Sequence, residues 1–184
     1  MEYRIRTPLD EYTAGMLRAG DVVYISGTVF GARDAAHKKM SDLIASGCDL
    51  PFDIRGQVIY YVGPCPARAG MVIGSAGPTT SSRMDIYAPR LIRMGLRGMI
   101  GKGLRSSEVK DAMKCCKAVY FAAVGGAGAL LAERISAQSI IAFPELGPEA
   151  LRKLTLVEFP TVVAIDSIGT DIYEKGRELY HCEG

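Results

Sequence analysis

The chain has 184 residues, of which 48% are hydrophobic and 23% charged, and its 22 basic and 20 acidic residues leave a net charge of +2. These values are ordinary for one globular domain, and so small a net charge gives no argument for binding nucleic acid or an anionic membrane surface. No apolar run is long enough to span a membrane, and the N-terminus lacks the apolar segment of a secretory signal. We therefore expect a cytoplasmic protein in which residues 1–184 form a single domain.

The five cysteines do not form a metal-binding pattern, because their number is odd and no Cys-x-x-Cys pair occurs. Cys48, Cys65 and Cys182 are far apart in the sequence. Cys115 and Cys116 are neighbours near a predicted helix end, where adjacent side chains project in different directions. We expect reduced thiols and no metal ligands here, so an iron–sulfur cluster, if one is used, would have to be held by another chain.

The first part of the chain predicts two strands and a helix. Residues 3–5 alternate in polarity like a short edge strand, and residues 22–30 are rich in the β-branched and aromatic side chains typical of a strand, with a break at Gly27. A helix is expected to start near Arg33 and to stop at Gly47, because apolar residues recur on one of its faces.

The middle of the chain continues this alternation. Residues 57–62 and 70–73 are apolar runs that predict two buried strands. A helix follows them, indicated by apolar residues at spacings of three and four: Met84, Tyr87, Leu91 and Met94. Residues 98–103 form a short glycine-rich stretch with a lysine near its end, and Ser106 is expected to cap the next helix.

The last part of the chain is richer in strands. Residues 118–124 are a strongly apolar strand, from which the glycine-rich residues 125–128 lead into a predicted helix. The remaining predicted elements are that helix at 129–135, strands at 139–143, 154–159 and 161–165, a helical turn at 148–152 and a last helix at 171–180.

Short apolar strands that alternate with helices argue for an α/β fold with a parallel central sheet. The strands that lack helical partners imply a second, smaller antiparallel sheet. Ligands of parallel sheets bind at the carboxyl ends of the strands, which is where the glycine-rich loops of this chain are expected to lie.

Residues 74–83, Gly-Ser-Ala-Gly-Pro-Thr-Thr-Ser-Ser-Arg, join a predicted strand to a predicted helix. Glycine allows backbone N–H groups to approach a ligand closely, and the hydroxyl groups offer donors and helix caps. The positive end of a helix dipole favours an anion, and Arg83 adds a donor fork suited to a carboxylate. This stretch therefore predicts a binding site for a small anion, with a capped turn and a surface arginine as the alternative.

Further cations occur at other predicted strand-to-helix junctions. Arg33 and His37 are four residues apart, so they share one face at the start of a helix. Together with Arg83 and Lys102 they indicate a ligand with more than one negative charge, such as a dicarboxylate, because each carboxylate favours an arginine or lysine. For His37 alone, a partly exposed helix residue without a functional role is the alternative interpretation.

Two glycine-rich segments do not match nucleotide-binding motifs. Residues 101–103 lack the Walker spacing, and in the segment that starts at Gly125 the third glycine of a dinucleotide loop is replaced by Leu131. Tight packing of a strand on a helix explains the glycines at 125–128.

Several motifs in this order resemble a known family. They are Ser26-Gly-Thr-Val-Phe-Gly-Ala-Arg33-Asp-Ala-Ala-His37-Lys38, Tyr61-Val-Gly-Pro-Cys65-Pro, Gly77-Pro-Thr-Thr-Ser-Ser-Arg83-Met-Asp85, Ile100-Gly-Lys102-Gly, Glu145-Leu-Gly-Pro-Glu149-Ala and Val163-Ala-Ile-Asp166. The sequence is similar in these motifs, over almost its whole length, to the β subunit of class I fumarate hydratases, which forms the C-terminal domain of single-chain members. The β subunit of L(+)-tartrate dehydratase shares them.

The resemblance implies a fold, a cofactor and a partner. The family's β part has a swivelling β/β/α domain. Its α part holds an oxygen-sensitive [4Fe–4S] cluster with three cysteines, and the open iron of the cluster binds the substrate and acts as a Lewis acid. This chain would then be the β subunit that works with a fumarase α subunit in the reversible hydration of fumarate to malate.

The resemblance also implies roles for individual residues. Arg33, Arg83 and Lys102 would bind the substrate carboxylates. Thr79 would be the base that removes the C3 proton of malate, and Thr80 would help to hold the substrate. A threonine base requires neighbouring cations or a helix N-terminus to stabilise the alkoxide. His37 lies in a motif without a defined role, and Ser81-Ser82 stand where many relatives carry smaller residues.

Two other functions remain open at this point. L(+)-tartrate dehydratase performs the same chemistry on a substrate with one more hydroxyl, and the absent subunit could read that hydroxyl. A non-catalytic subunit that binds a dicarboxylate or stabilises a partner is the other alternative, and the presence together of Thr79, Arg33 and Arg83 argues against it. Without its α subunit, the chain is expected to expose an apolar or glycine-rich face and to be able to form a homodimer.

Overall fold

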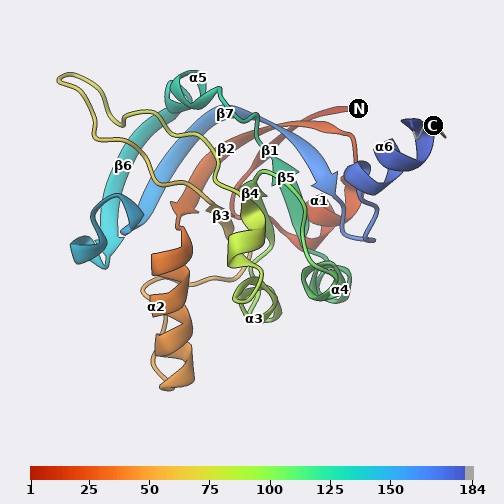
Figure 1. Cartoon of the computed structure of the whole chain (residues 1–184), viewed down its shortest axis with the longest axis horizontal. Helices are drawn as coiled ribbons and strands as arrows, with labels where there is room; N and C mark the ends of the chain where they lie inside the picture. The colour runs from red at the N-terminus through yellow and green to blue at the C-terminus, as the bar shows by residue number, and fades with distance from the viewer. Residues whose placement is uncertain (181–184) are drawn as a thin grey trace.

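The computed structural model describes residues 1–180 and has a mixed α/β fold (Figure 1). Its strands are β1 (Glu2–Arg6), β2 (Val22–Gly31), β3 (Val58–Tyr60), β4 (Gly98–Gly101), β5 (Val119–Ala122), β6 (Ile135–Ala142) and β7 (Leu151–Ile165). Its helices are α1 (Glu11–Met16), α2 (Asp34–Ala45), α3 (Ala88–Arg93), α4 (Ser107–Cys116), α5 (Gly128–Ala132) and α6 (Ile172–Tyr180), with 3-10 turns η1 (Ser81–Met84) and η2 (Pro144–Glu149). None of these helices is long and apolar enough to cross a membrane.

The seven strands form one sheet in the order β1-β2-β3-β4-β5-β7-β6. Strands β1 to β5 pair in parallel, whereas β7 runs antiparallel to β5, β6 and β2. The β2–β7 pairing closes a ring that consists of β2, β3, β4, β5 and β7. The predicted parallel central sheet is confirmed. The predicted separate antiparallel sheet is wrong, because the long strand β7 joins the antiparallel strands to the parallel ones.

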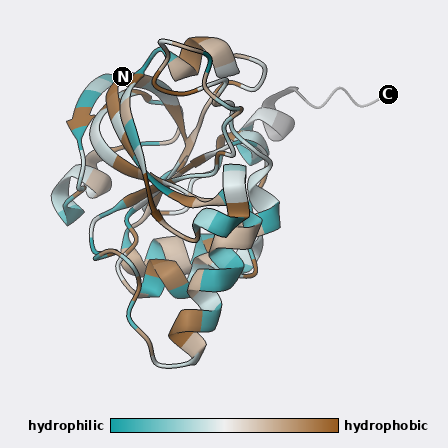
Figure 2. Cartoon of the chain, turned by 90° about the vertical axis from the view of Figure 1, so that its left-hand side faces the viewer, coloured by the Kyte–Doolittle hydropathy of each residue, from teal (hydrophilic) through white to brown (hydrophobic). Residues whose placement is uncertain are grey.

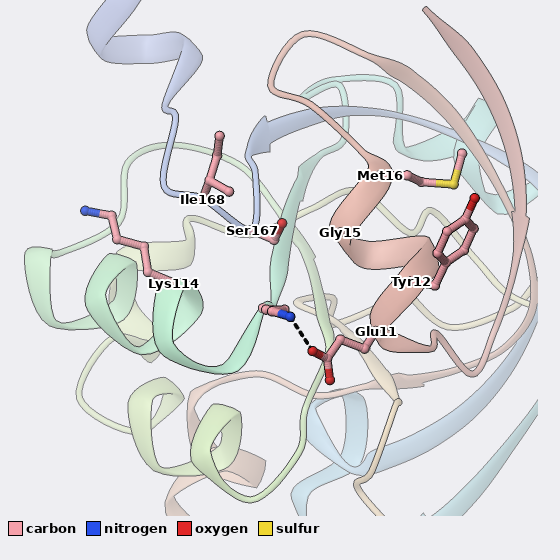
Figure 3. A pocket seen from close by; sticks show the side chains of 8 residues that line it. Glu11, Tyr12, Gly15, Met16, Lys114, Ser167 and Ile168 are labelled. Atoms are coloured by element: carbon pink, nitrogen blue, oxygen red, sulfur yellow. Dashed lines mark hydrogen bonds and ion pairs between the residues drawn. The ribbon is translucent and has the colours of Figure 1, made fainter.

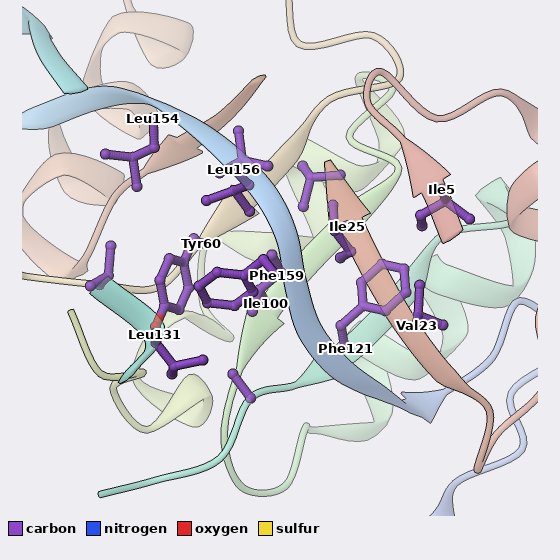
Figure 4. Close-up of a cluster of buried hydrophobic side chains, with 14 of the residues drawn as sticks. Ile5, Val23, Ile25, Tyr60, Ile100, Phe121, Leu131, Leu154, Leu156 and Phe159 are labelled. Atoms are coloured by element: carbon purple, nitrogen blue, oxygen red, sulfur yellow. The ribbon is translucent and has the colours of Figure 1, made fainter. Parts of the chain in front are cut away.

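Alternate side chains of the central strands enter two different hydrophobic cores. Tyr60, Ile100 and Phe121 point into the ring, where they meet residues of β2 and β7 such as Ile25 and Phe159 (Figure 4). Strand residues of the opposite register pack instead with α2, α3 and α4, which lie together on one side of the sheet (Figure 1). These helices carry both hydrophilic and hydrophobic bands (Figure 2), as amphipathic helices on a sheet require. The central parallel strands β3, β4 and β5 are therefore buried on both faces, whereas the edge strand β1 is mostly exposed.

Several predicted elements are confirmed. The strand at 22–30 exists, and its break at Gly27 is a register irregularity against β7 in which this glycine has φ +108°. A Cβ at Gly27 would lie 2.6 Å from the Thr7 hydroxyl, so only glycine fits. Ser106 caps α4 as predicted, since its hydroxyl accepts from the Val109 N–H at 3.4 Å.

Other predicted elements are wrong. Residues 70–73 form no strand, because only Ile73 of this run packs into the core while Met71 and Val72 are exposed. The helix predicted at 129–135 ends at Ala132, and Ile135 already begins β6, which starts before the strand predicted at 139–143. The helical turn predicted at 148–152 ends at Glu149, and β7 follows it. The two strands predicted at 154–159 and 161–165 are one strand.

Candidate functional site

The predicted site residues lie where the parallel strands β2, β3 and β4 end. Arg33 follows β2 and begins α2, and Lys102 follows β4 directly. The segment of residues 78–84 lies across these ends, because the Thr79 N–H donates to the carbonyl of Tyr61, after β3, at 2.8 Å. The Ser81 N–H donates to the Lys102 carbonyl at 2.9 Å. The structure therefore gathers all the predicted residues at the carboxyl edge of the sheet, where such sheets bind ligands.

Arg33 is held in place by a carboxylate that the sequence analysis did not assign. Its guanidinium lies 3.2 Å from a carboxylate oxygen of Glu149, and the other oxygen of Glu149 accepts from the Ala35 N–H at 3.2 Å. Glu149 therefore supplies the side-chain cap of α2 that Arg33 itself does not form. The stem of Arg33 lies over Gly63, where a Cβ would come within 2.7 Å of it.

Arg83 and Arg33 meet at one acidic side chain. Arg83 donates to a carboxylate oxygen of Asp34, and the Arg33 guanidinium lies 3.9 Å from the same oxygen. The Arg83 side chain is 51% exposed, so it is open to a ligand that would replace or share Asp34. The two arginines thus form a cationic pair bridged by one carboxylate.

His37 is completely buried, so its interpretation as a partly exposed helix residue is wrong. Its Nδ1 lies 2.8 Å from the carbonyl oxygen of Arg33, and its ring packs edge-on against Tyr61 with the centroids 5.4 Å apart. Burial, with a smaller contribution from the charge of Arg105, lowers the pKa of His37 to about 4. The imidazole is therefore neutral at pH 7 and donates its Nδ1–H to the Arg33 carbonyl.

Thr79, Thr80 and Lys102 lie together on the other side of the site. Thr79 is half-buried, Thr80 is exposed, and Thr80 pairs with the exposed Lys102 in a short parallel bridge. The glycine loop that follows β5 lies next to this lysine, since a Cβ at Gly125 would be 3.8 Å from its Nζ. Lys102 therefore lies between the threonine segment and the glycine loop.

A buried polar layer, formed by Arg105, Tyr61, Tyr120 and Asp85, lies beneath the site residues. Part of it was not predicted from the sequence. The guanidinium of Arg105 lies between the rings of Tyr61 and Tyr120, at 5.3 Å and 5.1 Å from their centroids. Its Nε donates to Asp85 at 2.7 Å, and Asp85 also accepts from the Ser106 N–H at 2.6 Å. Tyr61 and Asp85 had a signal in the sequence as residues of motifs, and Ser106 as a predicted helix cap, whereas Arg105 and Tyr120 had none as site residues.

The described residues do not fit an iron–sulfur cluster. Among the side chains that the structure describes, no group of three or more His, Cys, Asp or Glu could hold a metal ion. The free cysteines there are Cys48, Cys65, Cys115 and Cys116, and Cys182 lies outside the described residues. No chemical step is therefore assigned to a cluster on this chain.

A pocket of about 510 Å³ lies away from this site, between α1, α4 and the turn that follows β7 (Figure 3). Its lining is Glu11, Tyr12, Gly15, Met16, Lys114, Lys117, Ser167 and Ile168. Tyr12, Met16 and Ile168 give it apolar surface, and two of its lining residues, Glu11 and Lys117, form an ion pair. Because Lys117 precedes β5, this pocket is near the amino ends of the parallel strands, away from the gathered cations.

Comparison with known proteins gives relatives named as fumarate hydratases and one named as a tartrate dehydratase subunit. The chain is 39% identical over 153 residues to "Fumarate hydratase class I, anaerobic" of Escherichia coli K12, which covers 82% of this chain and 28% of that protein. It is 37% identical to "Fumarate hydratase 2" of Leishmania major, over 94% of this chain and 30% of that protein. It is 37% identical to "Putative L(+)-tartrate dehydratase subunit beta" of Methanocaldococcus jannaschii, over 98% of this chain and 95% of that protein.

The chain thus spans less than a third of these two fumarate hydratases but nearly all of the tartrate dehydratase subunit. The model of a protein family described as Fumarase C-terminus matches residues 4–176, which is most of the sequence. The match includes every residue of the site described above. The chain therefore belongs to the Fumarase C-terminus family.

Proposed function

We propose that this chain is the β subunit of a two-subunit hydro-lyase that hydrates fumarate reversibly to (S)-malate. The observation that carries the proposal is the convergence of Arg33, Arg83 and Lys102 with Thr79 and Thr80 at one edge of the sheet. A dicarboxylate needs two cationic partners at separate points, and the arginine pair and Lys102 provide them from different segments. The proposed fold is the swivelling β/β/α domain of the family.

In this proposal the cations bind and orient the substrate. Arg33 can still reach a ligand, since its side chain is 23% exposed although Glu149 anchors its guanidinium. Fixing both carboxylates restricts the C2–C3 bond so that the proton and the hydroxide leave in the required geometry. His37 would act as a positioning residue, because its neutral ring holds the carbonyl of Arg33.

Thr79 is proposed as the base that removes the C3 proton, and Thr80 as a further contact to the substrate. An ordinary hydroxyl is almost never ionised at neutral pH, so nearby positive charge has to stabilise the alkoxide. The backbone position of Thr79, next to Tyr61 and close in sequence to Arg83, supports this assignment. Lys102 would supply the second cation through its bridge with Thr80.

The proposed partner is an α subunit that holds the [4Fe–4S] cluster. The share of each relative that this chain covers supports a separate α subunit. The chain covers 28% of one fumarate hydratase but 95% of a relative that is named as a subunit. Exposed apolar residues near the site edge also support it: Val124 is 67% exposed and Leu130 66% exposed. We expect the partner to cover these side chains in a cytoplasmic complex, and the isolated chain to be able to pair with itself.

The proposal is tested by measuring fumarate hydration under anaerobic conditions. The chain is assayed alone and then mixed with the cluster-bearing chain from the same source. We expect activity only in the mixture. A mixture that forms a complex, keeps its cluster and hydrates no fumarate would refute the proposed substrate.

L(+)-tartrate is the second candidate substrate, because the relative that matches over nearly its whole length is named as a tartrate dehydratase subunit. The same anaerobic assay with L-tartrate decides between them, since the correct substrate will have the higher kcat/KM. Calorimetry of this chain alone with malate tests the non-catalytic alternative. Tight binding without a partner would favour a dicarboxylate-binding module over a catalytic half.

A further inference from the structure

Ser81 is buried beneath the exposed segment that carries the candidate site residues. Its side chain has no exposed surface, whereas Thr80 before it and Ser82 after it are exposed. A buried hydroxyl has to be hydrogen-bonded to offset its desolvation. The partners of Ser81 therefore show what this residue holds together.

The hydroxyl of Ser81 connects two site segments to strand β5. It lies 2.8 Å from the hydroxyl of Tyr120, and it accepts from the Lys102 N–H at 3.1 Å. The Tyr120 hydroxyl donates to the Gly103 carbonyl at 3.0 Å. Because a tyrosine hydroxyl has one hydrogen, Ser81 must donate to Tyr120, and the bonds then run in one direction from Lys102 through Ser81 and Tyr120 to Gly103.

The backbone adds a further bond to this chain of hydroxyls. The Ser81 N–H donates to the Lys102 carbonyl at 2.9 Å, so residues 81 and 102 exchange two bonds. Burial raises the pKa of Tyr120, which therefore stays protonated and remains a donor over the working pH range. Hydrogen bonds in such a network reinforce one another in a low-dielectric interior.

The space for this hydroxyl depends on the absence of a side chain at position 101. A Cβ at Gly101 would lie 2.0 Å from the Ser81 hydroxyl oxygen and 2.9 Å from the ring of Tyr61. The end of β4 is thus shaped to receive Ser81 closely. Ser81 is therefore fitted into the fold and is not an incidental polar residue of a loop.

A second connection joins the same two segments further along. Asp85, just after η1, accepts from Arg105 and from the Ser106 N–H. Both lie in the loop that begins at Lys102. The segment that carries the site residues is therefore fastened to the Lys102 loop at Ser81 and again at Asp85.

We propose that Ser81 and Tyr120 are positioning residues that hold Lys102 and the Thr79–Thr80 segment in register with each other. The flexible stem of a lysine leaves the location of its ammonium dependent on the backbone from which it starts. The bonds of the Ser81 and Tyr120 hydroxyls hold the backbone of Lys102 in a defined position next to Thr80. This inference rests on the proposed function for its link to substrate binding, whereas its structural part stands without it.

The test uses Ser81→Ala and Tyr120→Phe, with Ser82→Ala as the matched control at an exposed neighbouring serine. Tyr120→Phe keeps the ring against which Arg105 packs. In the full chain without a partner, we expect amide hydrogen exchange at Lys102 to become about tenfold faster in both variants and to stay unchanged in Ser82→Ala. Unchanged exchange at Lys102 in both variants would overturn the proposal.

The kinetic readout uses the reconstituted two-chain complex. We expect KM for the substrate to rise about three- to tenfold in Ser81→Ala and in Tyr120→Phe, with kcat nearly unchanged. The double variant should be no worse than the more impaired single variant, because both remove one chain of bonds. A lower melting temperature with unchanged KM would show a merely structural role and refute positioning. An inactive wild-type complex would refute the proposed function alone, because the exchange readout uses no substrate.

Discussion

The guanidinium of Arg33 lies 3.2 Å from a carboxylate oxygen of Glu149, so this arginine is already oriented by one carboxylate before any substrate binds. Glu149 is fixed in turn by its bond to the Ala35 N–H at the start of α2. A planar guanidinium can hold this anchor with one edge and offer its other donors to a ligand. A lysine at the same position would keep the positive charge but would lack the planar set of N–H donors of a guanidinium.

Arg33→Lys should therefore weaken substrate binding although it keeps the charge. Loss of a charge-assisted hydrogen bond costs about 1.5–3 kcal/mol, which corresponds to an increase in KM of about tenfold to a hundredfold. Steady-state kinetics of the two-chain complex measures this change in KM. Arg55→Lys, at an arginine whose side chain is 78% exposed, serves as the control and should change nothing. A wild-type KM in Arg33→Lys would mean that Arg33 does not contact the substrate through its fork.

Thr79→Ala should lose turnover while substrate still binds. Removal of a general base lowers kcat by about a hundredfold to ten-thousandfold, whereas the carboxylate contacts of the arginines and Lys102 are left intact. Thr79→Ser keeps a hydroxyl and should retain more of the activity. Turnover is measured in the complex, and malate affinity is measured by calorimetry of the same sample. Wild-type turnover in Thr79→Ala would remove Thr79 from the mechanism.

The sequence predicted the location of the site more fully than its internal contacts. Glycines, hydroxyls and cations at strand-to-helix junctions are visible as local patterns, and the parallel sheet then brings them to one edge. The Glu149 anchor and the Ser81 hydroxyl chain involve residues far apart in the sequence, and nothing local indicates such pairs. Burial of His37 was missed for the same reason, since Tyr61 and Tyr87, whose rings pack near its own, come from other segments.

The errors in the fold have similar causes. Residues 70–73 are apolar like a strand but have no neighbouring strand to pair with, and a short apolar run cannot reveal this. Strand β4 was missed because glycine has low strand propensity, yet all four of its residues are buried between β3 and β5. A Cβ at Gly98 would lie 2.8 Å from Val58, so close packing of strands selects glycine here.

The neutral state of His37 predicts a loss of stability in acid. Its pKa is about 4 in the folded chain and near 6.5 when unfolded, so between these values the unfolded chain binds more protons than the folded one. Neutral His37 contributes about 3 kcal/mol to the free energy of unfolding. This contribution is complete above pH 6.5 and is lost as the pH falls towards 4. Urea unfolding at several pH values measures the free energy of unfolding.

The control for His37 is a variant that cannot titrate. His37→Gln can still donate to the Arg33 carbonyl, and its free energy of unfolding should fall less steeply than that of the wild type between pH 6.5 and 4. The chain has two histidines, so NMR titration of their ring protons assigns the signal that this variant lacks. A His37 signal that titrates near pH 6.5 in the folded chain would contradict the buried, neutral state.

Asp85→Asn should destabilise the fold strongly. The Arg105 side chain is fully buried and Asp85 is its only ion-pair partner among the described residues, so the variant leaves a buried charge uncompensated. We expect a loss of about 3–5 kcal/mol in the free energy of unfolding. Asp53→Asn breaks an exposed pair with Arg55 and should cost less than about 1 kcal/mol. Equal effects of the two substitutions in urea unfolding would contradict the burial of Arg105.

Gly101→Ala tests how closely the end of β4 fits against the site segment. The added Cβ would lie 2.0 Å from the Ser81 hydroxyl oxygen, and Ser81 cannot move without breaking its bonds to Lys102 and Tyr120. We expect a loss of about 1–3 kcal/mol from overpacking, which lowers the melting temperature by about 2–4 °C per kcal/mol.

The matched control for this substitution is Gly15→Ala in α1, where no atom lies within 4 Å of the added Cβ. Alanine favours a helix over glycine by up to about 1 kcal/mol, so this variant should be as stable as the wild type or more stable. If contact with the added Cβ, and not the loss of a glycine, causes the destabilisation, Gly101→Ala lowers the melting temperature and Gly15→Ala does not. A Gly101→Ala chain with the wild-type melting temperature would mean that Ser81 can leave its place at little cost, and the close fit at this edge of the sheet would then be wrong.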